Sequence, residues 1–255
     1  MSSPTAIPGS APGALDEVEL VPASESDIFQ LTEIHVAAFA DDNAVRLTYN
    51  RDEQENAVIN MINCQFRSPN FPIAMAVNPP SVRELGWIGY RLFEDNELKE
   101  NEAMPSAEAK NIGTEGEQRE ETGGREVVRE HNITNTSSAL AALISNTGKR
   151  MQYKRMSGQK HILLNTLVTS PRHRGKGVGT AMVRWIVAKA DAERLSCWVQ
   201  SSPAAYGLYL KAGFEVTDSL EVDLRTFAPR GKGGQEGYGM YTFRYMIRHP
   251  VNSSC

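Results

Sequence analysis

The residues with the clearest chemical potential lie between Asn165 and Gly179, which read N-T-L-V-T-S-P-R-H-R-G-K-G-V-G. This stretch begins as an apolar strand, breaks at Ser170-Pro171 and continues as a basic, glycine-spaced loop. Apolar residues at helical spacing follow at once; they are Val178, Ala181, Met182, Trp185 and Ile186. Free amides and the positive dipole end at a helix start favour a bound phosphate. The order strand, glycine loop, helix start therefore predicts a phosphate site.

The spacing of the glycines decides which kind of phosphate loop this is. The Walker pattern G-x-x-x-x-G-K-[ST] does not occur in the chain. The dinucleotide pattern G-x-G-x-x-G would need a third glycine where Thr180 or Met182 stands. The pattern that does fit is R-x-x-G-x-G, from Arg174 to Gly179, after a strand that ends in V-x-x-P.

A second motif lies downstream, in S-S-P-A-A-Y-G-L-Y-L-K-A-G-F from Ser201 to Phe214. It contains the pattern A-x-x-L-Y-x-K-x-G-F after a polar residue, Ser202. The two motifs, in this order and separated by one predicted helix and one predicted strand, resemble those of the GCN5-related N-acetyltransferase (GNAT) family. The resemblance covers residues 160–216. It implies an α/β GNAT fold, in which a central mixed, mostly antiparallel β-sheet with splayed central strands is flanked by helices.

The resemblance also implies a donor and a reaction. The chain is expected to bind acetyl-CoA and to move the acetyl group directly to a primary amine of a small molecule or peptide in a ternary complex. Ser202 stands where many family members carry an asparagine that contacts pantetheine. The cofactor-binding residues implied by the match are Leu167, Val168, Arg172, Arg174, Gly175, Lys176, Gly177, Val178, Gly179, Thr180, Ser202 and Tyr206.

Tyr209 is the expected general acid. A phenol with a pKa of about 10 is protonated at neutral pH, so it can donate a proton to the departing thiolate. Tyr206 is an alternative for this role, and packing against the sheet is the alternative role for Tyr209. The general base stays open: the central strand offers His161 and Asn165 but no carboxylate. An ordered water chain, or a carboxylate such as Glu33, are the alternatives.

Two other classes of function are alternatives to an enzyme. A non-catalytic CoA-binding or protein-interaction domain of the same fold is the main alternative, and an unchanged function after Tyr209→Phe would favour it. A nucleic-acid-binding module would show steep salt-dependent binding, which a chain with a net charge of −4 does not indicate. Nucleic acid is therefore not an expected partner.

Composition gives the expected surroundings of the chain. It has no run of about 18 apolar residues and no basic-then-apolar N-terminus, which predicts no membrane partner. Cys64, Cys197 and Cys255 are scattered without C-x-x-C spacing. This pattern predicts no metal site and a reducing, cytoplasmic location. We expect a monomer or a homodimer.

The domain prediction is one acyltransferase domain over 15–249, with a disordered tail at 1–14 and a C-terminal tail at 250–255. An acidic insertion at about 94–137 is expected to be disordered or loosely helical, because charged and small residues dominate it.

Periodicity and turn residues predict the elements inside that domain. The predicted helices span about 27–40, 52–67, 138–154, the segment after the glycine loop, and 203–211. The predicted strands span about 17–21, 71–77, 86–93, 161–168, 196–199, 214–217 and 240–247. His35 lies on the apolar face of the first helix and is expected to be a packed or surface residue.

Overall fold

The structure is a computed structural model that describes residues 18–49, 51–79, 83–95, 97–98, 125–128, 136–228 and 237–251. The predicted N-terminal tail, most of the predicted acidic insertion and the last four residues lie outside the described residues. Among the helices that are described, none has the length and apolar character needed to cross a bilayer.

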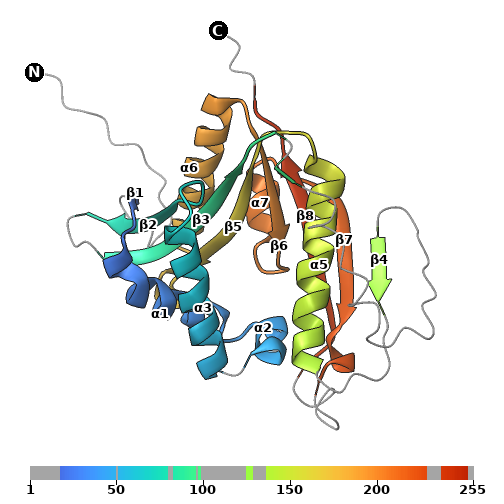
Figure 1. Cartoon of the computed structure of the whole chain (residues 1–255). Coiled ribbons are helices and arrows are strands. Elements are labelled where there is room, and N and C mark those ends of the chain that lie inside the picture. Colours follow the sequence, from blue (N-terminus) through green and yellow to red (C-terminus); the bar gives the residue numbers. More distant parts are fainter. Residues whose placement is uncertain are drawn as a thin grey trace, which may run out of the picture.

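The strands form one mixed sheet in the order β1-β2-β3-β5-β6-β8-β7-β4 (Figure 1). The strands are β1 (Glu19–Pro22), β2 (Ile73–Asn78), β3 (Arg83–Phe93), β4 (Arg125–Val128), β5 (His161–Thr169), β6 (Ser196–Ser201), β7 (Glu215–Asp223) and β8 (Met240–Arg248). The helices are α1 (Ile28–Phe39), α2 (Asn43–Thr48), α3 (Arg51–Phe66), α5 (Thr136–Met156), α6 (Val178–Glu193) and α7 (Tyr206–Lys211). Among the described strands, β5–β6 and β4–β7 are the only parallel pairs, so the predicted mixed, mostly antiparallel sheet is confirmed.

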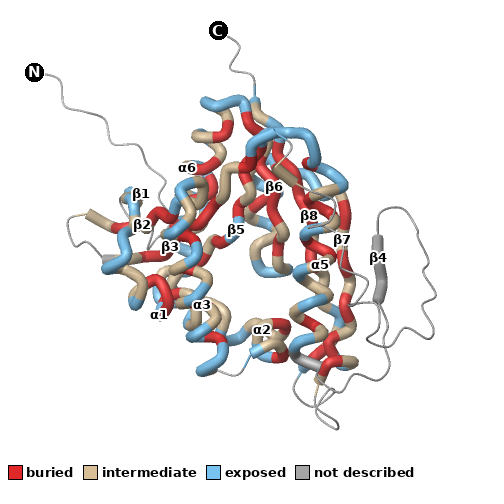
Figure 2. Tube along the Cα trace, in the orientation of Figure 1, coloured by how far each residue is buried: buried red, intermediate tan, exposed pale blue. Residues whose placement is uncertain are grey.

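Helices cover the sheet on both faces (Figure 1). Neighbouring side chains of β3 show the two layers, because successive residues of a strand point to opposite faces. Ile88 belongs to the core under α6 and α7, whereas Trp87 belongs to the core under α1 and α3. The Trp87 indole donates to the carbonyl of Leu31 at 2.9 Å, which fixes α1 on the sheet. Figure 2 shows the buried residues concentrated along the central strands, with the outer sides of α3 and α5 exposed.

The face that carries α1 and α3 has two separate cores. One lies under α1 and α3 over β2 and β3, and the other lies under α2 and α5 over β7 and β8. The central strands β5 and β6 lie between them. The helices therefore flank the middle of the sheet on this face without closing over it, as Figure 1 shows.

The two central strands separate part of the way along. β5 pairs with β6 only from His161 to Leu164, although β5 continues to Thr169 and β6 to Ser201. On its other side β5 carries a β-bulge, because Tyr90 of β3 pairs with Leu164 and Gly89 pairs with Thr166. Asn165 is the extra residue of this bulge. Bulges bend a strand and redirect its side chains, and this one lies where β5 leaves β6.

An ion pair joins α5 to the sheet. The carboxylate of Asp218, on β7, accepts hydrogen bonds from Arg155 at 2.7 and 3.1 Å and lies 3.4 Å from Lys154. Its side chain is 1% exposed, whereas that of Arg155 is 36% exposed. Burial alone raises the pKa of Asp218, but the hydrogen bonds and charge of Arg155, with help from Lys154, outweigh burial and hold it below its usual value.

Replacing Asp218 by asparagine is expected to lower the free energy of unfolding by about 2 kcal/mol at pH 7, because it leaves a part-buried guanidinium without its charge partner. A carboxyl with a lowered folded-state pKa stabilises the fold above its unfolded pKa of about 4 and loses that effect as pH falls. Urea unfolding at several pH values should therefore show the wild-type and variant curves converging below about pH 4. A difference that stays constant with pH would assign the effect to packing.

Three elements depart from the sequence expectations. α2 was not predicted; it exists because the Asp42 carboxylate accepts from the amides of Ala44 and Val45 and so caps a short helix. β7 runs past the predicted 214–217 as far as Asp223, since alternate residues along it are buried. Within the predicted insertion, Arg125–Val128 forms β4 in parallel with β7.

Candidate active site

The glycine loop after β5 has the backbone conformation of an anion cradle. Gly175 and Gly177 have φ values of +73° and +88°, a region that L side chains rarely adopt. Gly177 is the N-cap residue of α6, so the first-turn amides of this 16-residue helix face the loop. A Cβ built on either glycine would meet no heavy atom within 4 Å among the described residues. A ligand can therefore approach the bare backbone here.

The other loop residues surround this point. Arg172, Lys176 and Thr180 are exposed, whereas Val178 is buried in the core under α6. A Cβ on Gly179 would lie 3.3 Å from the Leu208 side chain, so this glycine lets α6 pack against α7. The positive loop charge and the helix start are thus brought together as the sequence predicts.

Arg174 makes a contact that the motif did not predict. Its guanidinium donates to the carbonyl of Ala38, near the end of α1. The loop that follows β5 is therefore tied to the helix that begins the other half of the molecule.

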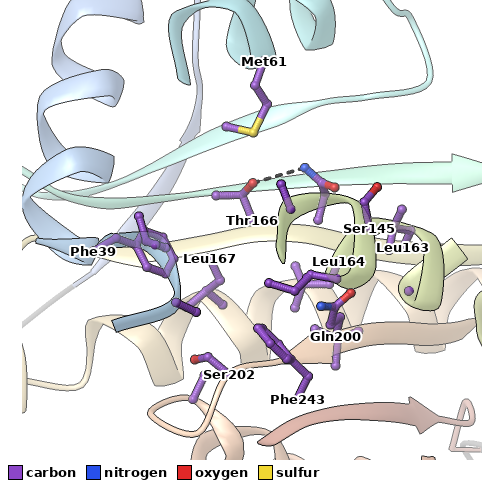
Figure 3. Close-up of a pocket in the computed structure, with 18 of the residues that line it drawn as sticks. Phe39, Met61, Ser145, Leu163, Leu164, Thr166, Leu167, Gln200, Ser202 and Phe243 are labelled. Carbon is purple, nitrogen blue, oxygen red and sulfur yellow. Dashed lines mark hydrogen bonds between the residues drawn. The ribbon is translucent and has the colours of Figure 1, made fainter. Parts of the chain in front are cut away.

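A cavity of about 980 Å³ opens where β5 and β6 separate. Its floor includes Leu164, Thr166 and Leu167 of β5 and Gln200 of β6, and its walls come from α1, α3 and α5. Figure 3 shows Met61 directed from α3 toward Thr166, with Phe39 and Leu167 at one side and Ser202 and Phe243 below them. Known small-ligand sites have volumes of this order, about 300–1,000 Å³.

The residues of the second motif lie at this cavity. Ser202, Ala205 and Tyr209 line it. Tyr209 is 4% exposed and packs edge-on against Phe214 at 5.4 Å between ring centroids. Burial raises the pKa of its phenol well above the usual value, so the group stays protonated at neutral pH. Tyr206 is half-buried and lies under the guanidinium of Arg244 at 4.2 Å, outside the residues that line the cavity.

Asp42 supplies the only carboxylate among the described residues that line the cavity. One oxygen accepts from the amides that cap α2, and the other accepts from the phenol of Tyr241 at 2.7 Å. Burial, the hydrogen bond to Asp42 and the Asp42 charge raise the pKa of Tyr241, while a hydrogen bond from Ser202 opposes them. Asp42 and Tyr241 therefore connect the first helices to the second motif.

The other histidine and acid candidates are placed differently. His35 lines the cavity, 4.9 Å from the Phe39 ring; its Nδ1 has no partner within the described part of the chain, and burial lowers its pKa to about 4. It is therefore neutral at pH 7. His161 is fully buried between Gln152 and the carbonyl of Gln159, and it does not line the cavity. Glu33 is exposed and does not line it either.

The comparisons with known proteins agree with this geometry. The family model for the acetyltransferase (GNAT) domain matches residues 139–216, which include the glycine loop and the second motif. Residues 139–216 of this chain are therefore similar to a GNAT domain. Acetyl transfer is the general class of chemistry that the match supports. A search of curated proteins finds no match to the sequence.

Solved structures share the GNAT fold with this chain. Arylalkylamine N-acetyltransferase 2 from Aedes aegypti aligns with a TM-score of 0.60 at 13% identity, over 92% of this chain and 100% of that one. Mosquito arylalkylamine N-acetyltransferase like 5b aligns with a TM-score of 0.54 at 12% identity, over 91% and 100%. Both likenesses show the fold.

The GNAT donor, acetyl-CoA, fits the residues present. Its pyrophosphate needs amide donors and positive charge, which the left-handed Gly177 and the exposed Lys176 offer at the start of α6. Its extended pantetheine arm needs backbone N–H and C=O groups that are free to form hydrogen bonds. β5 offers such groups after Leu164, because its edge toward β6 is unpaired there in the described sheet. The described residues hold no cluster of three or more metal-ligating side chains.

Proposed function

We propose that this chain is an acetyl-CoA-dependent N-acetyltransferase that acetylates a primary amine in a ternary complex. The observation that carries the proposal is the cavity at the β5–β6 separation. It brings the donor motifs, represented by Leu167 and Tyr209, to the same space as one carboxylate, Asp42. A cavity with a single carboxylate and a protonated phenol matches a cationic acceptor and an anionic leaving group.

On the donor side the protein binds and orients. Acetyl-CoA supplies an acyl group already activated as a thioester. The amides at Gly177 to Thr180 would hold the pyrophosphate, and the side chains of Arg172 and Lys176 would add positive charge. The backbone of Leu167 and Val168 would align the pantetheine and the acyl carbonyl with the cavity. Holding the reactants in place in this way accounts for much of the expected rate increase.

Tyr209 is the proposed general acid. Its proton moves from the phenol oxygen to the thiolate sulfur as the carbon–sulfur bond breaks. Burial keeps the phenol protonated well beyond neutral pH, so the acid is present in the form that the step requires. Tyr206 faces Arg244 instead and lies outside the residues that line the cavity.

On the acceptor side Asp42 is the proposed anchor and proton acceptor for the amine: its carboxylate binds the ammonium form and takes one proton from it, so that the neutral nitrogen attacks the acyl carbon. Its carboxylate is held in one orientation by two amides and the Tyr241 phenol. It therefore takes the place that Glu33 had among the sequence candidates, since Glu33 is exposed and outside the cavity lining. Aromatic side chains line the cavity as well; they include Phe39, Tyr49, Phe93, Trp198, Tyr241 and Phe243. Such a lining suits a cationic amine with an apolar body.

The direct test measures thiol release from acetyl-CoA in the presence of a panel of primary amines. The panel should include amino-acid amides and arylalkylamines. Arylalkylamines are chosen because the names of the two aligned proteins contain that substrate. We expect amine-dependent thiol release together with a mass increase of one acetyl group on the amine. Binding of acetyl-CoA without turnover on any amine would instead assign a non-catalytic CoA-binding domain.

Replacing Tyr209 by phenylalanine is expected to lower kcat about 100-fold, the usual size of a lost general acid. The affinity for acetyl-CoA should stay within threefold, because the aromatic packing against Phe214 remains. The raised pKa also predicts no loss of wild-type activity from phenol ionisation up to pH 10. Thiol-release assays from pH 6 to 10 measure kcat and its pH dependence, and calorimetry measures the affinity for acetyl-CoA. A variant with wild-type kcat would return Tyr209 to a packing role.

A further inference from the structure

A second, smaller pocket opens beside the main cavity, with a volume of about 400 Å³. We call it the side pocket. It lies between α3 and the central strands, and three of its residues, Met61, Arg91 and Asn165, also line the main cavity. Its other lining residues are Cys64, Gln65, Ser68 and Phe71. The side pocket is thus an extension of the space in which the acceptor amine would lie.

Gln65 is the unusual residue of the side pocket. Its side chain is 2% exposed, yet neither amide atom has a hydrogen-bond partner within the described part of the chain. Buried polar groups are normally paired, and an unpaired one costs about 1–3 kcal/mol. Gly89 of β3 makes room for this amide: a Cβ built there would lie 2.8 Å from Gln65 Oε1. The backbone is therefore shaped to accept a carboxamide at this position.

Arg91 adds a second unpaired donor to the same pocket. It lies two residues after Gly89, on the same face of β3. One terminal nitrogen donates to Glu97, and the guanidinium lies over the Phe93 ring at 4.3 Å. These contacts fix the group, but its Nε is buried with no partner among the described residues. The Arg91 Nε–H is thus a second buried donor without a partner within the described residues.

The unpaired groups define what a ligand must offer. Gln65 Nε2 and Arg91 Nε are donors, and Gln65 Oε1 is an acceptor. A secondary amide carries both complements, since its carbonyl accepts and its N–H donates. A simple alkyl or aryl group offers neither, and a carboxylate offers no donor to Gln65 Oε1.

We propose that the side pocket binds an amide group of the acceptor, so that the acceptor is a peptide or an amino-acid amide. This inference rests on the proposed N-acetyltransferase function. The reacting amine would lie in the main cavity and the amide would reach past Asn165 and Met61 into the side pocket. Figure 3 shows Met61 directed from α3 toward Thr166 of the central strand β5. Asn165 is the bulge residue of β5, so the passage starts where the strand is redirected.

The test compares matched acceptors that differ only in the amide. One member of each pair is an aromatic amino-acid N-methylamide, and the other is the amine of the same size without the amide. We expect wild-type kcat/KM to favour the amide member at least tenfold. Gln65→Met, which keeps the side-chain length but removes both polar atoms, should reduce this preference to about one. Gly89→Ala should do the same, because its methyl group displaces the Gln65 amide. Asn60→Ala, which removes a carboxamide from the exposed side of α3, should keep the preference.

A binding measurement separates this proposal from the catalytic one. The side-chain NH₂ resonances of Gln65 are assigned by their absence in Gln65→Met. They should shift when the N-methylamide is added and not when its amide-free partner is added. Turnover without an amide preference would overturn the side-pocket proposal and leave the enzyme intact. Unshifted Gln65 resonances with both compounds would overturn it too, and would assign Gln65 to bound water alone. Shifted resonances without any turnover would support the side pocket and reject the catalytic proposal.

Discussion

Replacing Gly177 by glutamate is expected to weaken acetyl-CoA binding at least 100-fold. The new carboxylate would stand at the N-cap of α6, in the open space that the bare backbone leaves for a pyrophosphate. It would block the first-turn amides and repel the ligand's negative charge. A loss of about 3 kcal/mol corresponds to two powers of ten in the dissociation constant. Isothermal calorimetry of acetyl-CoA against the wild type and the variant measures it.

Two control variants separate the causes of that loss. Gly177→Ala introduces the strain of a side chain at φ +88° without a charge, and the built Cβ meets nothing within 4 Å among the described residues. We expect less than a tenfold loss. Gly158→Glu places the same carboxylate at another left-handed glycine, just before the opposite end of β5, and should bind normally. Wild-type affinity in Gly177→Glu would place the pyrophosphate elsewhere. No binding by the folded wild type would reject acetyl-CoA as the ligand.

Replacing Asp42 by asparagine is expected to lower kcat/KM for the amine 30- to 100-fold. A charged hydrogen bond to a bound ammonium contributes about 1.5–3 kcal/mol, and the neutral amide loses most of it. Asparagine also caps helices well, so α2 should keep its start. The variant therefore removes a charge with little change of structure. Steady-state kinetics with varied amine, at saturating acetyl-CoA, gives the ratio.

The matched control for Asp42 is Tyr241→Phe. It removes the phenol that donates to the second carboxylate oxygen but keeps the charge and the ring contact with Phe243 at 4.7 Å. We expect a loss of less than tenfold. Acetyl-CoA affinity measured by calorimetry should be equal in both variants and the wild type. An unchanged kcat/KM in Asp42→Asn would mean that the amine binds away from this carboxylate.

The donor half of the site could be predicted from the sequence because it is local. The whole glycine loop, the end of its strand and its helix start lie within the fifteen residues from Asn165 to Gly179. Left-handed glycines and a helix N-terminus are properties of consecutive residues, so the motif specifies the geometry. The positions of the strands along the chain, except β4, also followed from turn residues and periodicity, and the sheet type implied by the resemblance is confirmed.

The acceptor half could not be predicted because its contacts join distant parts of the chain. Asp42 and Tyr241 are 199 positions apart. Taken alone, Asp42 is interpreted as a helix cap, and Tyr241 as an aromatic residue of a strand. The two local signals were present: Asp42 precedes a short helical segment, and aromatic residues alternate along β8 at 241, 243 and 245. Nothing in the sequence says that these two elements face one cavity. His35 shows the same limit, since helical spacing placed it on the buried face without showing that this face borders a cavity.

The contact between Arg174 and the carbonyl of Ala38 has a thermodynamic consequence. It joins the loop that would hold the donor to the end of α1, four residues before the carboxylate that would hold the acceptor. A ligand that settles the loop also settles the end of this helix, and with it the Asp42 side of the cavity. Free-energy coupling between two sites is reciprocal. We therefore expect each proposed substrate to raise the affinity for the other, so that the complete pair is favoured over either half-filled state.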